Sequence, residues 1–351
     1  MVPALVAVFA LGCAPGTAGA IQDPPSPYSD VRSVTWYSLT VTYAEYLEAL
    51  RVQIPRMRRA GFNTVWLVTP WRDLNPKPFA SPPVYHDENF AGLLGVLEDL
   101  RANGMRAFLG LNYLGTGWAP KGIDACRWVT EPRMYRAFEV YVREFLRRTK
   151  ASADVALILF FTETAVPCHL NPAADGATIT ALMRPTLGSL PLRLPQKLRA
   201  QFLIGYHDFI TAEGWALDSP MVTPAPFDFQ SGGVYGLETR TDQEIRKEIK
   251  LRARRFKTLF PGLPLVMGEL GAYSCGPDED ANQSRVLLAM VKQARNLKLG
   301  VNIWNWQPAT PRGCAQVGAG NGLNIVNQDG SPRPAALALA ALFGGSFPEG
   351  E

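Results

Sequence analysis

Two glutamates close two apolar runs of the sequence. The run VALILFFTE ends on Glu163, and the run LPLVMGE ends on Glu269. A short apolar run bounded by turn-forming residues is typical of a strand buried on both faces, so each carboxylate should lie where a strand leaves the core. Each could be a lone surface acid. If both strands belong to one parallel barrel, however, the two acids open into the same cleft. One could then protonate a glycosidic oxygen while the other acts as nucleophile or base.

The elements that must position these acids alternate along the chain. Strand-like apolar runs and amphipathic helical segments follow one another from residue 33 to the end, which is typical of βα units around a parallel sheet. Strands are expected over residues 33–39, 63–70, 106–113, 155–163, 202–209, 227–235, 263–269 and 300–307. Helices are expected over residues 43–61, 90–104, 132–150, 242–259, 278–297 and 334–343. Between residues 164 and 195 we expect a long loop with one helical piece.

This pattern predicts an α/β fold, a single-domain (β/α)8 TIM barrel that occupies residues 21–351. The alternative is an open doubly wound sheet, which usually carries a glycine-rich phosphate loop after its first strand. The sequence has no such loop at that place. A closed barrel also explains why the informative residues fall at carboxyl ends of strands, where barrel enzymes keep their active sites.

Composition and charge exclude some classes of function. The 351 residues are 47% hydrophobic and carry a net charge of +4. The basic residues lie mostly in amphipathic helical stretches such as VREFLRRTK, which indicates solvated outer faces of helices. A nucleic-acid interface would need a clustered basic patch with interleaved aromatic residues. We therefore expect no nucleic acid as a partner. The chemistry of two carboxylates makes a carbohydrate the expected substrate and needs no metal and no cofactor. The protein is expected to be a monomer.

The amino-terminal residues resemble an export signal. Residues 1–20 hold an apolar stretch followed by Ala18-Gly19-Ala20, which has the form of a signal-peptidase site. The alternative is that Ala10-Leu11-Gly12-Cys13 is a bacterial lipobox, in which case Cys13 carries a lipid anchor and is the membrane contact. We expect a secreted, periplasmic or cell-surface lipoprotein.

Four cysteines follow Cys13, and an even number in an exported chain suggests disulfide bonds. Cys126 and Cys168 come after adjacent strands three and four, while Cys275 and Cys314 come after adjacent strands seven and eight. The prediction is therefore that Cys126 pairs with Cys168 and Cys275 with Cys314. Zinc is the competing hypothesis, but neither C-x-x-C nor H-x-x-x-H spacing occurs in the sequence.

The glutamates at the ends of strands four and seven resemble those of the retaining β-glycosidases of glycoside hydrolase clan A, and family 5 is the nearest familiar group. The resemblance spans nearly the whole chain after the signal, and the final phrase GLNIVNQDGSPRPAALAL is similar to the end of many such barrels. It implies that Glu163 is the acid/base and Glu269 the nucleophile. It also implies that Tyr235 hydrogen-bonds the nucleophile, and that Trp306, with Trp304 close behind, forms the floor of the sugar site.

The sequence departs from the family pattern at three positions. Thr162 replaces the asparagine that usually precedes the acid/base and holds the sugar 2-hydroxyl. Trp66 stands in strand two where family 5 tends to have arginine, and Gly233 stands where it tends to have histidine. Other strand-end residues that could contact sugar, or could equally be structural, are Trp71, Arg72, Asn112, Trp118 and His207.

The resulting prediction is an exported retaining glycosidase of β-linked polysaccharides or oligosaccharides, acting by double displacement. The main alternative is a barrel that binds a cell-wall or capsular glycan without cleaving it. The departures at Thr162 and Trp66 favour this alternative, and the presence of both glutamates opposes it. A lyase or aldolase would need a lysine or a metal cluster at a strand end, and the sequence offers no such lysine.

Overall fold

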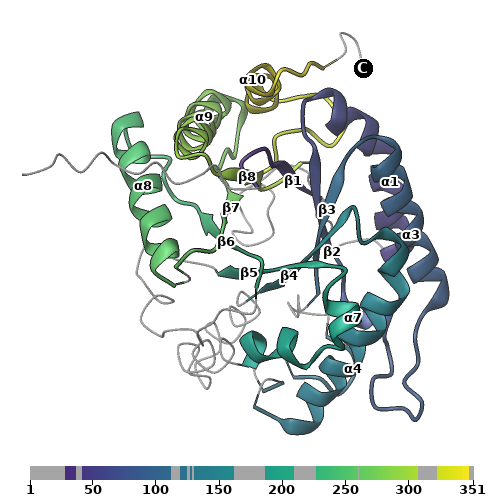
Figure 1. Cartoon of the computed structure of the whole chain (residues 1–351). Helices are drawn as coiled ribbons and strands as arrows, with labels where there is room; N and C mark the ends of the chain where they lie inside the picture. The colour runs from purple at the N-terminus through teal and green to yellow at the C-terminus, as the bar shows by residue number, and fades with distance from the viewer. Residues whose placement is uncertain are drawn as a thin grey trace, which may run out of the picture.

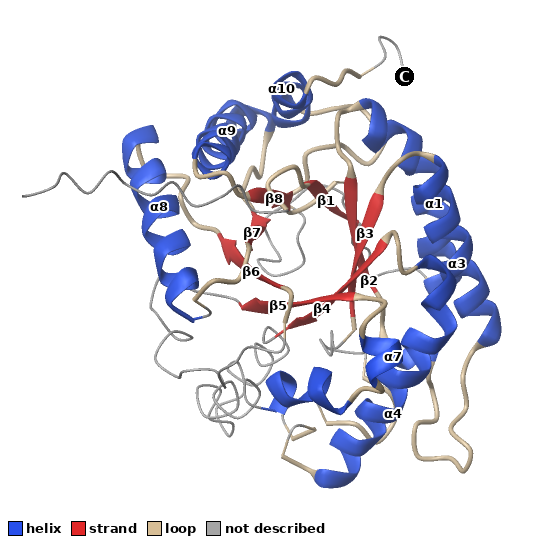
Figure 2. Ribbon diagram, viewed as in Figure 1, coloured by secondary structure: helices blue, strands red, loops and turns tan. Residues whose placement is uncertain are grey.

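The computed structural model is a closed parallel barrel of eight strands, with helices around its outside (Figures 1 and 2). Each strand pairs with its neighbours in sequence, and β8 returns to pair with β1. The structure describes residues 28–36, 42–111, 119–124, 127–128, 130–161, 186–208, 227–259, 261–306 and 322–347. The predicted (β/α)8 TIM barrel is confirmed.

All eight predicted strands are present, mostly a few residues shorter than the apolar runs suggest. Their bounds are β1 Arg32–Trp36, β2 Thr64–Val68, β3 Arg106–Gly110, β4 Ala156–Phe161, β5 Leu203–Asp208, β6 Phe229–Val234, β7 Leu265–Leu270 and β8 Gly300–Ile303. At β6 and β8 the predicted run continues past the strand, since Tyr235 and Trp304 follow the last strand residue and pack together in the loops.

The helices form a ring outside the barrel. Their bounds are α1 Tyr43–Arg59, α2 Trp71–Leu74, α3 Asp87–Ala102, α4 Pro132–Thr149, α7 Gln196–Arg199, α8 Asp242–Leu259, α9 Asp280–Asn296 and α10 Pro334–Phe343. A further helical stretch covers residues 186–193. No helix in the described ranges is both long and apolar enough to cross a membrane.

Sequence signals explain the helix ends. Thr42 caps α1, and its hydroxyl and the carboxylate of Glu45 form a reciprocal capping box. Pro334 occupies the first turn of α10, where a missing N–H costs nothing, and Gly344 ends that helix with a φ of 75°.

The alternation of side chains along each strand divides the core into two parts. Outward residues such as Val34, Leu67 and Ile158 join the large cluster between the barrel and the helices. Inward residues fill the barrel itself, and this inner cluster consists of Tyr28, Val31, Trp66, Phe108, Leu157, Leu159, Phe229 and Val266. Because the interior is packed with these side chains, a ligand can enter only at an end of the barrel.

Strand β7 interrupts this alternation. Its pairing with β6 steps from Gly232 opposite Met267 to Gly233 opposite Glu269, and its pairing with β8 is irregular between Met267 and Leu270. Strand β7 therefore carries one extra residue relative to both neighbours, which defines a β-bulge at Gly268–Glu269. The bulge lies at the carboxyl end of the strand, where the sequence places its candidate nucleophile.

Candidate active site

Glu269 lies at the carboxyl end of β7 with only 1% of its surface exposed. The Tyr235 hydroxyl, from the residue after β6, donates a 2.7 Å hydrogen bond to Glu269 Oε2. The predicted contact between this tyrosine and the candidate nucleophile is therefore present. This hydrogen bond fixes the orientation of the Glu269 carboxylate.

The β-bulge accounts for the direction in which Glu269 points. Leu265, Met267 and Leu270 all pack in the outer cluster, although Met267 and Leu270 are three residues apart. A regular strand would place residues at odd separation on opposite faces. The extra residue lets Leu270 face the helices while Glu269 turns toward Tyr235 and His207 at the end of the barrel.

A layer of polar side chains lies directly beneath Glu269 inside the barrel. His207 lies on β5, and its Nδ1 forms a 3.0 Å hydrogen bond with Ser231 Oγ on β6. The other ring nitrogen, Nε2, lies 3.8 Å from Glu269 Oε1. Asn302 on β8 donates from Nδ2 to Gly268 O at 2.7 Å and to Thr35 Oγ1 at 2.8 Å. The backbone of the bulge is thus held from below by a side-chain amide.

Gly268 is needed because of this layer. A Cβ at position 268 would overlap with Ser231 Oγ and would lie 2.9 Å from His207 Nδ1. Only glycine lets β7 pass this close to the Ser231–His207 pair. The sequence MGE therefore meets two requirements. Gly268 has no side chain to collide with the polar layer, and Glu269 places a carboxylate immediately after it.

His207 is neutral in this environment. Complete burial lowers its pKa from 6.5 to about 3, because the imidazolium form would lose its hydration. The 3.8 Å approach to Glu269 is therefore a contact between a carboxylate and a neutral ring rather than an ion pair. The edge of the ring also meets Trp66, with centroids 5.1 Å apart and planes at 87°. His207, predicted as a sugar contact, lies under Glu269 and fixes the site from below.

Aromatic side chains form a wall beside Glu269. Trp304, just past β8, packs with Val68 and Leu323, and the half-buried rings of Tyr235 and Tyr273 pack against this group. Gly271 makes room here as well, since a Cβ at that position would overlap with the Tyr235 ring. The peptide bond between Trp304 and Asn305 is cis. Aromatic faces next to a carboxylate suit the apolar C–H face of a sugar ring.

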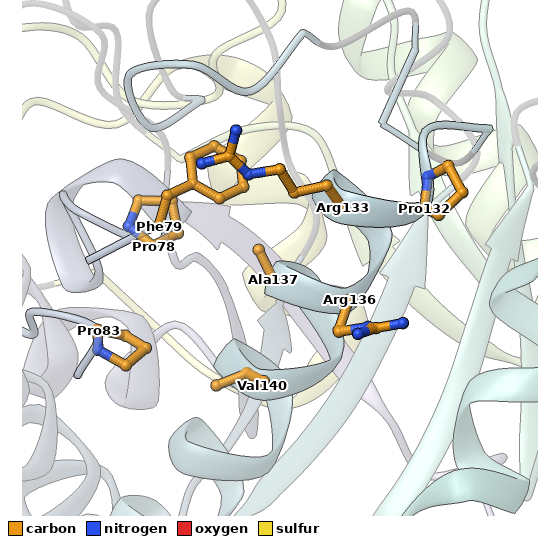
Figure 3. Close-up of a pocket in the computed structure, with 8 residues that line it drawn as sticks. All are labelled: Pro78, Phe79, Pro83, Pro132, Arg133, Arg136, Ala137 and Val140. Atoms are coloured by element: carbon orange, nitrogen blue, oxygen red, sulfur yellow. The ribbon is translucent and has the colours of Figure 1, made fainter. Parts of the chain in front are cut away.

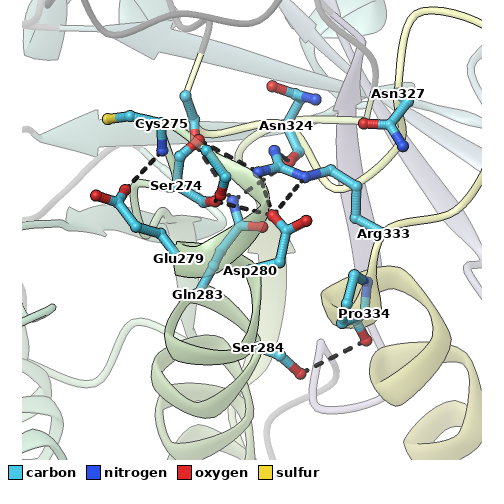
Figure 4. Close-up of polar contacts among 12 residues, drawn as sticks. Ser274, Cys275, Glu279, Asp280, Gln283, Ser284, Asn324, Asn327, Arg333 and Pro334 are labelled. Atoms are coloured by element: carbon cyan, nitrogen blue, oxygen red, sulfur yellow. Dashed lines mark hydrogen bonds and ion pairs between the residues drawn. The ribbon is translucent and has the colours of Figure 1, made fainter.

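Buried polar contacts join the two loops that carry this wall (Figure 4). Arg333, fully buried before α10, pairs with Asp280 at 2.6 Å and also donates to the carbonyl oxygens of Ser274 and Asn324. Gln283 Nε2 donates to the carbonyl oxygens of Ala272 and Gly322 and also to that of Asn324, over 2.9 to 3.3 Å. The loop after β7 and the loop after β8 are thereby held in one arrangement around Trp304.

The two tryptophans predicted for the sugar floor lie in different clusters. Trp306 is fully buried in the outer cluster, where its ring stacks on Phe347 with centroids 5.8 Å apart and its Nε1 donates to Gln53 Oε1. Trp304, 8% exposed, is the one that lies with Tyr235. Sequence spacing could not choose between them, because regular alternation ends with β8 at Ile303.

Trp71 and Arg72 are not brought to Glu269 by any contact in the described part of the chain. Trp71 is fully buried, stacked on Tyr141 at 5.5 Å, and donates from Nε1 to Asn75 Oδ1. Of the two roles that the sequence allowed for Trp71, sugar contact or core packing, the structure shows core packing. Arg72 is exposed on α2 and pairs with the adjacent Asp73 over 3.1 Å.

Several predicted residues lie outside the described residues. These are Glu163, Thr162, Asn112 and Trp118 of the site, Cys13, and the cysteines Cys126, Cys168 and Cys314. Cys275 is disulfide-bonded in the structure, but its predicted pairing with Cys314 stays a prediction. Within the described ranges, no group of three or more histidine, cysteine, aspartate or glutamate side chains could hold a metal ion.

Sequence reasoning missed Ser231, Asn302, Gly268 and Tyr273. Ser231 and Asn302 interrupt apolar runs at inward positions, and a polar residue at such a position is the signal that could have found them. Gly268 and Tyr273 give no comparable signal, because their roles depend on the bulge and on the path of a loop.

The comparisons with known proteins agree with this fold. No family model and no curated protein matches the chain in sequence. Among solved structures, an exo-beta-1,4-mannosidase from Opitutaceae bacterium strain TAV5 superposes with a TM-score of 0.69 at 17% identity, over 89% of this chain and 58% of that one. A GH5_18 protein from Streptomyces cattleya, in complex with Manb1-4GlcNAc, gives 0.68 at 14% identity, over 89% of this chain and 79% of that one.

A family 39 glycoside hydrolase from Bacteroides cellulosilyticus WH2 gives a TM-score of 0.55 at 12% identity, over 91% of this chain and 65% of that one. The chain thus spans less than two thirds of the mannosidase and of the family 39 protein. At these identities the likeness shows that this chain shares its barrel fold with these glycoside hydrolases.

We predict that Gly268→Ala destabilises the protein by about 2 kcal/mol, because the new methyl group must displace Ser231 or His207 in a packed interior. Urea unfolding followed by circular dichroism measures the change. The double variant Gly268→Ala/Ser231→Ala should recover part of the loss, since it removes the oxygen that the methyl group meets. Gly95→Ala is the matched control, because a Cβ there meets nothing within 4 Å. An equal effect of both single variants would contradict the close packing at Gly268.

We predict that His207 makes the protein less stable in mild acid. The folded-state pKa of about 3 lies below the value of 6.5 for an exposed histidine, so between these values only the unfolded chain takes up the proton. The stabilising effect is complete above pH 6.5 and is lost as the pH falls. From pH 7 to pH 4.5 this one group should lower the free energy of unfolding by about 2.5 kcal/mol.

Urea unfolding of wild type and His207→Gln at both pH values measures this difference. The pH-dependent contributions of the carboxylates are common to both proteins and cancel when the two are compared. The variant should lose about 2.5 kcal/mol less than wild type over that interval. Identical pH dependence of the two proteins would mean that His207 titrates normally in the folded state.

Proposed function

We propose that this chain is a retaining glycoside hydrolase that acts on β-linked glycans. The observation that carries the proposal is the Glu269 site, in which a buried carboxylate at the end of β7 accepts a hydrogen bond from Tyr235 beside the ring of Trp304. A fixed carboxylate next to an aromatic platform can attack an anomeric carbon from one face of a sugar. The shared fold with glycoside hydrolases supports this interpretation.

Glu269 is the nucleophile in this proposal, and Glu163 is the acid/base. Glu269 forms a bond to the anomeric carbon while Glu163 protonates the departing oxygen, and Glu163 then deprotonates the water that releases the sugar. The two carboxyl groups of a retaining enzyme are about 5 to 5.5 Å apart. The neutral layer beneath Glu269 holds the nucleophile in place, while Trp304 and Tyr273 contact the sugar.

The solved structures that share this fold suggest which substrates to test first. One neighbour is named as an exo-beta-1,4-mannosidase, and another was crystallised with Manb1-4GlcNAc. We therefore place β-mannosides first in a panel, followed by β-glucosides. The proposal also includes export, through a leader that is either cleaved after Ala20 or lipidated at Cys13, and disulfides that pair Cys126 with Cys168 and Cys275 with Cys314.

Hydrolysis of this panel by wild type, Glu163→Gln and Glu269→Gln tests the mechanism. Both variants should lose at least about a thousandfold in kcat, because each removes a group that acts in the transition state. Azide should restore the hydrolysis of an activated aryl glycoside by either variant. The anomeric configuration of the glycosyl azide then shows whether the variant lacks the nucleophile or the acid/base. Glycan binding without cleavage by wild type would favour the non-catalytic barrel instead.

The proposed disulfides and leader can be tested on protein exported from a bacterial host. Mass spectrometry of unreduced peptides should find the Cys275 peptide joined to the Cys314 peptide and Cys126 joined to Cys168. The amino-terminal peptide should begin either at residue 21 or at a lipid-modified Cys13. A free thiol at Cys314 would contradict the pairing, and an intact residue 1 in the exported protein would contradict the leader.

A further inference from the structure

A cavity lies on the outer rim of the barrel, away from Glu269. It has a volume of about 380 Å³ and separates the loop after β2 from the first half of α4 (Figure 3). Its lining consists of Pro78, Phe79, Pro83, Pro132, Arg133, Arg136, Ala137 and Val140. Six of these eight residues are apolar and two are arginine, so the cavity suits a ligand with an apolar face and an anionic group.

The wall formed by the loop is anchored to the core. Lys77 and Val84 form an antiparallel bridge at the base of the loop, and Asn75 Nδ2 donates to Val84 O at 2.7 Å. Asn75 is in turn held by the indole of the buried Trp71 over 3.1 Å. The prolines and Phe79 are therefore presented by a preformed structure, as in most small-molecule sites.

The positive charge of the cavity is not neutralised within it. The guanidinium of Arg133 lies over the Phe79 ring, 4.4 Å from its centroid, which holds that side chain in place (Figure 3). Arg136 is exposed on the other side of the cavity, with its guanidinium turned away from Phe79. The lining contains no acidic residue, and in the described ranges neither arginine forms an ion pair.

We propose that this cavity binds an acidic sugar unit, a pyranose that carries a carboxylate, within a glycan chain. The carboxylate pairs with Arg133, whose planar guanidinium can donate two parallel hydrogen bonds. The apolar C–H face of the ring lies against Pro83, Ala137 and Val140. A fatty acid fits less well, because the exposed Val140 and arginine side chains would leave an alkyl tail in water, whereas sugar hydroxyls are well solvated there.

The position of the cavity connects it with the site at Glu269. The loop that follows β2 and the start of α4 both lie at the carboxyl end of the barrel strands, the end at which Glu269 also lies. A glycan chain that is bound at Glu269 and long enough to cross the rim therefore extends toward the cavity. The inference deepens the proposed function by adding acidic units to the substrate, but binding at the cavity does not require hydrolysis.

Binding of methyl β-D-glucuronide and methyl β-D-glucoside to the full chain, followed by NMR titration, tests the proposal. The two probes differ only in the carboxylate. Wild type should bind the glucuronide with an affinity about five- to tenfold higher than that for the glucoside, and Arg133→Gln should remove the difference. Ala137→Glu, which places a carboxylate in the cavity, should have the same effect, while Ala137→Gln controls for its size.

Two further variants locate the binding. Arg246→Gln removes the same charge from the exposed face of α8 and should leave glucuronide binding unchanged, as should Glu269→Gln. Loss of binding in Glu269→Gln but not in Arg133→Gln would overturn the proposal by placing the ligand in the central site. Equal affinity for acetate would reduce the cavity to a simple anion contact. Binding that depends on Arg133 in a protein that hydrolyses nothing would support the cavity and reject the proposed enzyme.

Discussion

The β-bulge at Gly268–Glu269 is the constraint on which the site depends. One extra residue in β7 allows Leu270 to remain in the outer core while Glu269 faces the end of the barrel. The bulge is stabilised from two directions. Asn302 fixes the carbonyl of Gly268 from inside the barrel, and the outer cluster holds Met267 and Leu270 on the other face. The carboxylate is thus directed by backbone geometry rather than by the flexibility of its own side chain.

Glycine at 268 links that geometry to the chemistry beneath it. The Ser231–His207 pair occupies the space that any Cβ would need, so the polar layer and the bulge depend on one another. Because burial keeps His207 neutral, the layer contributes dipoles and no net charge. The contacts described around Glu269 therefore include one hydroxyl donor, from Tyr235, and the neutral ring of His207.

The sequence predicts the barrel well because its signal is repeated eight times. Each buried strand is mostly apolar, apart from a few inward polar residues such as Ser231 and Asn302, and an error at one strand end does not alter the other seven. It also places Glu269, since a charged residue directly after an apolar run has to lie where the strand emerges. The same reasoning cannot rank Trp304 over Trp306, because the chain leaves β8 at Ile303 and side-chain alternation no longer applies.

Loops account for the rest of what sequence reasoning could not reach. The positions of Trp304, Leu323 and Tyr273 follow from contacts between segments far apart in the chain, above all the buried Arg333 that joins the loops after β7 and β8. The role of Trp71 also depends on a loop. Its indole holds Asn75, which in turn holds the loop that forms one wall of the cavity at the barrel rim. A barrel strand fixes where a residue emerges, but the buried polar contacts of the loops decide which aromatic ring lies beside Tyr235 and Glu269.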